Sequence, residues 1–137
     1  MNFLTDQGQE IVEAFETCRL PNEQFHHRDH LRLALTYLAR HGKQEAALRL
    51  GQAIRTYAAH HGKSDKYHET VTQAWLQLVA AAQGRAPGGS FEDLLATNPE
   101  LLDSNLIERY YSPALLHSDA ARLRFVPPDR ESLPNAA

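Results

Sequence analysis

The spacing of apolar residues in the first 83 positions constrains the fold more than any other feature of the sequence. Within four segments, apolar side chains recur three or four positions apart, so each segment presents one apolar face when it forms an α-helix. Signals for β-strands are almost absent. The four predicted helices run from about Thr5 to Arg19, from Asn22 or Phe25 to His41, from Lys43 to His61, and from Asp65 to Gln83.

Glycine, proline and small capping residues divide the rest of the chain into shorter pieces. Ser90 is the expected N-cap of one short helix, and Asn98 with Pro99 supplies the N-cap and first residue of a second. Further helices are expected to begin at Ser112 and Ser118. The sequence therefore predicts an all-α fold, a four-helix-type bundle with short C-terminal helices wrapping it. The expected organisation is one domain over residues 1–137, with a bundle core at 5–83, a flexible connector at 84–90, short helices at 91–126 and a tail at 127–137.

Charge and hydropathy argue against several classes of function. The 137 residues carry 14 Lys and Arg against 17 Asp and Glu, whereas domains that bind nucleic acid usually present a basic face. No apolar run reaches the roughly 18 residues that a membrane-spanning helix needs, and the N-terminus has no leader pattern. The lone cysteine, Cys18, excludes an internal disulfide and suits a reducing compartment. We expect a cytoplasmic protein that binds neither nucleic acid nor membranes.

Histidine is the outlier in composition, with eight in 137 residues. His27 and His30 continue the apolar face of the second predicted helix, and His68 does so in the fourth. Short connections make neighbouring helices antiparallel, so the start of the second helix, the end of the third and the start of the fourth should share one end of the bundle. The helix ends that carry His61 and Cys18 should reach the same place. We therefore expect several imidazoles to converge there.

Neighbouring inward imidazoles need partners, and a divalent transition metal would supply one. His27 and His30 would give two ligands one helical turn apart and His68 a third, which leaves an open position as in catalytic metal sites. Zinc, iron and copper are all compatible with these ligands. The alternative for each histidine is a capping residue or a hydrogen-bonded core residue.

Two further features could assist chemistry at this site. Glu69, next to His68, is a candidate fourth ligand, orienting group or proton acceptor. Tyr110 and Tyr111 interrupt an amphipathic pattern among arginines, and they are candidate catalytic residues if their segment covers the histidine end. The alternative for this segment is a packed C-terminal wrap with one tyrosine buried and the other exposed.

Four short motifs follow one another along most of the chain. They are F-x-H-x-x-H-L from Phe25 to Leu31, Y-H-x-T from Tyr67 to Thr70, R-Y-Y-S-P from Arg109 to Pro113, and a proline-flanked end, FVPPDR, from Phe125 to Arg130. Together they resemble the pattern of a family of small, all-helical bacterial proteins. The resemblance implies a site at the same three histidines and implies no particular activity.

Two kinds of function are compatible with these features. The first is a small metal-dependent enzyme with a mononuclear site at His27, His30 and His68, acting on a small molecule by hydrolytic or oxidative chemistry. The second is a non-catalytic helical module that binds a partner protein, a small ligand or a metal, the last for sequestration or sensing.

Overall fold

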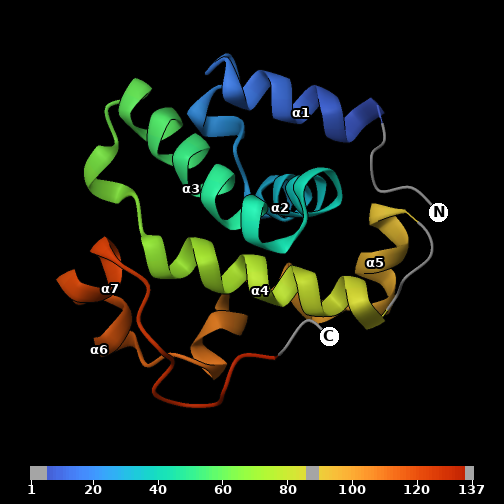
Figure 1. Ribbon diagram of the computed structural model, residues 1–137. Coiled ribbons are helices and arrows are strands. Elements are labelled where there is room, and N and C mark those ends of the chain that lie inside the picture. The colour runs from blue at the N-terminus through green and yellow to red at the C-terminus, as the bar shows by residue number, and fades with distance from the viewer. Residues whose placement is uncertain (1–5, 86–89, 135–137) are drawn as a thin grey trace.

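The computed structural model describes residues 6–85 and 90–134, and within these ranges every regular element is a helix (Figure 1). The prediction of an all-α bundle is confirmed. None of the described helices is long and apolar enough to cross a membrane. The α-helices are α1 (Asp6–Glu16), α2 (His27–His41), α3 (Lys43–His60), α4 (Glu69–Arg85), α5 (Phe91–Thr97), α6 (Pro113–Leu116) and α7 (Asp119–Leu123). The 3₁₀ helices are η1 (Asn22–Gln24), η2 (Ser64–Lys66), η3 (Pro99–Leu102) and η4 (Ser104–Arg109).

The bundle is built around α2 and α3, which pack against each other in the middle of the molecule. Helix α1 packs on one side of this pair and α4 on the other, as Figure 1 shows from top to bottom. Helix α2 also contacts η3, so it is buried on nearly all sides from Leu33 to Leu38. Each apolar side chain buried in this way contributes about 1.5–3 kcal/mol to folding. The periodic apolar faces of the sequence therefore form one continuous core.

The starts of α2 and α4 differ from the predicted ones for the same local reason. A 3₁₀ turn, η1 or η2, precedes each helix and is followed by an aromatic residue in extended backbone, Phe25 (ψ 92°) or Tyr67 (ψ 136°). Because extended backbone interrupts a helix, the predicted starts at Asn22 or Phe25 and at Asp65 are wrong. Both aromatic residues border the cavity that is described below.

The other helix boundaries shift by a turn or less. Helix α1 ends before the predicted Arg19 because Cys18 adopts a left-handed backbone conformation (φ 60°), which terminates a helix. Helix α3 ends one residue early, and α4 runs past the predicted Gln83 to Arg85. Ser90 caps α5 as predicted. Outside the described residues lie Thr5, positions 86–89 of the predicted connector and positions 135–137 of the predicted tail.

The C-terminal segment wraps α4, as predicted, and two hydroxyl groups hold it in place. Helix α7 packs on α4, and Thr70, in the first turn of α4, is fully buried. The Thr70 hydroxyl donates to the carbonyl of Arg124 (2.9 Å) and accepts the N–H of Val126 (3.1 Å). The Tyr111 hydroxyl donates to the carbonyl of Val126 (2.7 Å). Two side chains thus satisfy three backbone groups of the segment.

Replacing Thr70 by valine should lower the free energy of unfolding by about 1–3 kcal/mol, because it keeps the side-chain shape but removes the partner of two backbone groups. Thr36→Val is the matched control, since Thr36 is equally buried and its hydroxyl bonds only to the Arg32 carbonyl, four residues earlier in α2. We expect the control to lose less than about 1 kcal/mol. Urea unfolding of both variants measures the difference, and equal losses would contradict this role for Thr70.

Candidate functional site

A cavity of about 420 Å³ lies at one end of the bundle, where the start of α2, the end of α3 and the start of α4 meet. This confirms the prediction that these three helix ends share one end of the bundle. A concave, largely apolar wall with a few polar groups is the usual form of a small-molecule site. The lining residues are the apolar or aromatic Phe25, Ile54, Tyr57, Ala58, Tyr67 and Val71 and the polar Asn22, His30, Lys63, Lys66, His68 and Thr72.

His30, in the first turn of α2, has a ring nitrogen without a partner. Its Nε2 atom is buried, and no hydrogen-bonding partner for it lies among the described residues. Burial, with a smaller effect from the nearby His27, lowers the pKa of His30 from 6.5 to about 4, so the imidazole is neutral at neutral pH. A buried polar atom without a hydrogen bond costs about 1–3 kcal/mol. Because Nε2 itself is buried, a molecule in the cavity would reach it only if the imidazole turned toward the cavity, and the bond formed then would offset that cost.

His68 borders the same cavity, but both of its ring nitrogens are used by the backbone. The N–H of Val71 donates to Nδ1 (3.1 Å), which caps the first turn of α4. Because Nδ1 accepts a hydrogen bond, Nε2 carries the proton and donates to the carbonyl of Leu116 at the end of α6 (2.7 Å). His68 is therefore a capping residue whose two ring nitrogens are both engaged by the backbone.

His27 turns away from the cavity, although its spacing from His30 placed both on one helix face. Its Nε2 lies 2.7 Å from the carbonyl of Leu101 in η3, and its ring meets Trp75 edge-on with centroids 4.5 Å apart. In the part of the chain that the structure describes, no group of three or more His, Cys, Asp or Glu side chains is placed to hold one metal ion. The predicted set of His27, His30 and His68 is thus not assembled, and metal binding by these residues stays a prediction.

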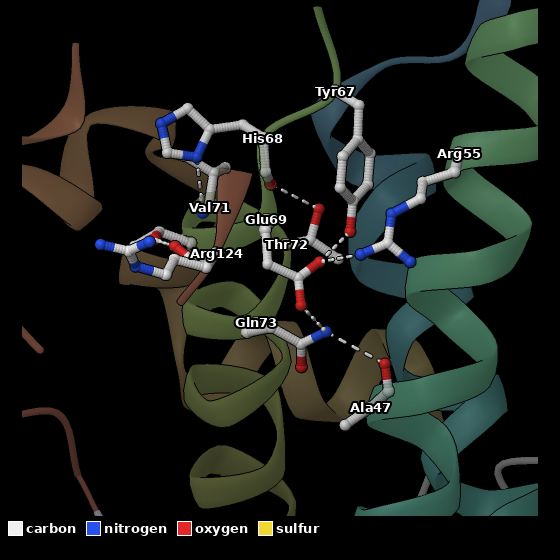
Figure 2. A network of polar contacts seen from close by, with 10 residues as sticks. Ala47, Arg55, Tyr67, His68, Glu69, Val71, Thr72, Gln73 and Arg124 are labelled. Atoms are coloured by element: carbon white, nitrogen blue, oxygen red, sulfur yellow. Dashed lines mark hydrogen bonds and ion pairs between the residues drawn. The ribbon is translucent and has the colours of Figure 1, made fainter. Parts of the chain in front are cut away.

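Glu69 belongs to a polar network between α3 and α4, which Figure 2 shows from close by. Its carboxylate accepts hydrogen bonds from the Tyr67 hydroxyl, from Arg55 (3.0 Å) and from Gln73 (3.4 Å). Glu69 is not part of the cavity wall, whereas the Tyr67 side chain is. The predicted catalytic role of Glu69 therefore has no support from its position, and its contact with the cavity runs through Tyr67.

The same network explains a glycine in the middle of α3. A Cβ atom at Gly51 would lie 3.3 Å from the Tyr67 hydroxyl oxygen and 3.7 Å from a carboxylate oxygen of Glu69. A Cβ atom here would require the Tyr67 hydroxyl to shift by a few tenths of an ångström, whereas the Glu69 oxygen would stay at ordinary contact distance. The Arg55 guanidinium covers the Tyr67 ring, 4.9 Å from its centroid. Tyr67 is thus held from two sides as a fixed wall of the cavity.

Tyr110 and Tyr111 lie elsewhere in the fold and do not line the cavity. Both are buried, so the alternative of one buried and one exposed tyrosine is wrong. The Tyr111 hydroxyl is bound to the Val126 carbonyl, and burial, assisted by Asp129, raises its pKa to about 12. In the C-terminal segment, Leu116 of α6 reaches the end of the bundle that holds the cavity, where its carbonyl group is bound to the His68 ring.

Other residues at this end of the bundle cap helices or pack against the cavity residues. His26 is the N-cap residue of α2, and its backbone N–H donates to the Asp29 carboxylate (3.0 Å). His61 follows α3 and packs on Tyr57, with ring centroids 4.4 Å apart. Its Nε2 atom is buried and has no hydrogen-bonding partner among the described residues, as in His30, but His61 does not line the cavity. Burial raises the pKa of Tyr57, and nearby Glu23 and Cys18 add to the effect, so the end of α1 reaches this end of the bundle as predicted.

Several lining residues were absent from the predicted site. Phe25 and Tyr67 each immediately precede a histidine-containing helix start, in the sequences FHH and YHE, and this repeated arrangement is the signal that could have identified them. Lys63 and Lys66 lie in the turn between α3 and α4, where lysine is common and carries no signal of its own. Neither family models nor curated proteins nor solved structures match the chain, so the resemblance drawn from its motifs stays a prediction.

The depressed pKa of His30 predicts a loss of stability in mild acid. The unfolded chain binds a proton near pH 6.5 and folded His30 only near pH 4, so the free energy of unfolding should fall as the pH drops through this window. The contribution of His30 between about pH 7.5 and pH 5 is about 2 kcal/mol. In His30→Leu this part of the pH dependence should vanish, and the variant should be more stable than the wild type at pH 5. Parallel stability profiles of the two proteins, measured by urea unfolding, would contradict the assignment.

Proposed function

We propose that the protein binds a small organic molecule in the cavity between α2, α3 and α4. The observation that carries this proposal is the buried Nε2 of His30, an unpartnered hydrogen-bonding atom on a side chain of a largely apolar cavity wall. Native proteins satisfy nearly all buried polar atoms, so each exception needs an explanation, and for a residue of a cavity wall a bound ligand is one. The ligand would have an apolar body and one polar group that bonds to His30 once its ring has turned toward the cavity.

The hydroxyl groups of the wall and the His68 ring favour binding over catalysis. The Tyr57 hydroxyl donates to the carbonyl of Leu20 (2.8 Å), and the Tyr67 hydroxyl is bound to Glu69. The Thr72 hydroxyl donates to the carbonyl of His68 (2.9 Å), whose ring nitrogens are also engaged. These groups hold the wall in shape, and a group committed to such a bond is poorly placed to transfer a proton to a ligand.

A neutral aromatic alcohol, 3-phenylpropan-1-ol, should bind with a dissociation constant of about 1 mM, as expected for some ten non-hydrogen atoms at about 0.4 kcal/mol each. Shifts of backbone amide signals during an NMR titration measure the affinity and locate the site. Ala58→Phe fills the cavity from its wall and should abolish binding. Ala59→Phe adds the same ring at the next, solvent-exposed position and should leave binding unchanged.

His30→Leu keeps an apolar group of similar size but removes the hydrogen bond, and it should weaken binding of the alcohol about fivefold, which corresponds to about 1 kcal/mol. Unperturbed signals around the cavity at saturating alcohol would overturn the proposal. If Ala58→Phe and Ala59→Phe bound the alcohol equally well, the site would lie elsewhere on the protein. This result would also overturn the proposal.

A further inference from the structure

Two lysines at the mouth of the cavity carry positive charge that the described protein does not neutralise. Lys63 immediately precedes η2 and Lys66 ends it, and both residues line the cavity while remaining exposed. Neither side chain forms an ion pair with any described residue. Two unpaired ammonium groups over an apolar pocket attract a molecule that is apolar at one end and negatively charged at the other.

No acidic residue of this region forms an ion pair with Lys63 or Lys66, although the exposed Glu23 lies near Tyr57, which lines the cavity. No Asp or Glu is among the residues that line the cavity. Asp65, which lies between the two lysines in the sequence, is exposed and is not part of the wall. Glu69 is bound to Arg55 and to the Tyr67 hydroxyl and is not part of the cavity wall. The chain as a whole carries a net charge of −3, so any preference for an anion must come from these local lysines.

From this arrangement we infer that the ligand is a small organic acid, whose carboxylate lies between Lys63 and Lys66 at the mouth and whose apolar body fills the cavity. The inference rests on the proposed ligand binding and adds the chemical class of the ligand. Phe25 and Tyr57 supply aromatic surface to the wall, so an aromatic body fits best. Partial exposure of the lysines makes the attraction sensitive to salt.

The test compares two probes of the same size, 3-phenylpropanoate and 3-phenylpropan-1-ol, by NMR titration of the full chain in about 20 mM salt. The acid should bind at least about tenfold more tightly than the alcohol, since two charges act on it at short range. In the double variant Lys63→Met, Lys66→Met this preference should fall to less than about threefold, while the affinity for the alcohol stays the same. Raising the salt to about 500 mM should weaken binding of the acid alone.

Lys43→Met is the control for the loss of a lysine away from the cavity, because Lys43 begins α3, at the end opposite to the one that borders the cavity. It removes one positive charge, whereas the double variant removes two. This variant should keep the full preference for the acid. Equal binding of acid and alcohol, with both blocked by Ala58→Phe, would overturn the inference and leave the proposed function intact. A preference that survives in the double variant would also overturn it, whereas failure of both probes to bind would overturn the proposed function itself.

Discussion

Four consecutive residues at the start of α4 tie that helix to three other parts of the chain, and the cavity depends on them. Tyr67 and Glu69 reach α3 through Gly51 and Arg55. His68 reaches the end of α6, and Thr70 reaches the segment that follows α7. The first turn of a helix has backbone N–H groups without partners in the helix, which favours polar residues there. In this protein the same polar residues also fix where α4 lies, as Figure 2 shows for the contacts with α3.

The two histidines of the cavity wall differ in whether their ring nitrogens form hydrogen bonds. His68 gives both ring nitrogens to the backbone, so it stabilises the fold and has nothing left to offer a ligand. His30 leaves Nε2 unbonded in a buried position, at a cost that is a sizeable part of the roughly 5–15 kcal/mol by which a domain is stable. An apolar side chain would avoid that cost. Under the proposed function, a histidine at this position would gain its hydrogen bond when the cavity is filled.

Helical periodicity located the bundle helices because it depends only on neighbours along the chain. The short connections between the helices also predicted that the start of α2, the end of α3 and the start of α4 would meet. The hydrogen bonds of His27 and His68 could not be predicted in this way, because their partners are the carbonyl groups of Leu101 and Leu116, far along the sequence. The metal hypothesis assumed that the imidazole nitrogens had no hydrogen-bonding partners elsewhere in the chain. Nothing in the local pattern around His27 or His68 places those distant carbonyls. The starts of α2 and α4 were missed for a local reason, since a 3₁₀ turn and an extended aromatic residue precede each helix and interrupt the helical pattern.

The cavity combines a rigid inner side with an adjustable mouth, and this division has a consequence for selectivity. Phe15, Phe25 and Tyr57 contact one another, with ring centroids 4.5–5.5 Å apart, and form a packed aromatic cluster beneath the cavity. Such a surface is already ordered, so binding against it loses little conformational entropy. Lys63 and Lys66 are long, exposed side chains that adapt to the position of a charge. The shape of the ligand body would then be selected by the aromatic wall, and its charge by the lysines, so the two properties of the ligand are recognised by separate parts of the fold.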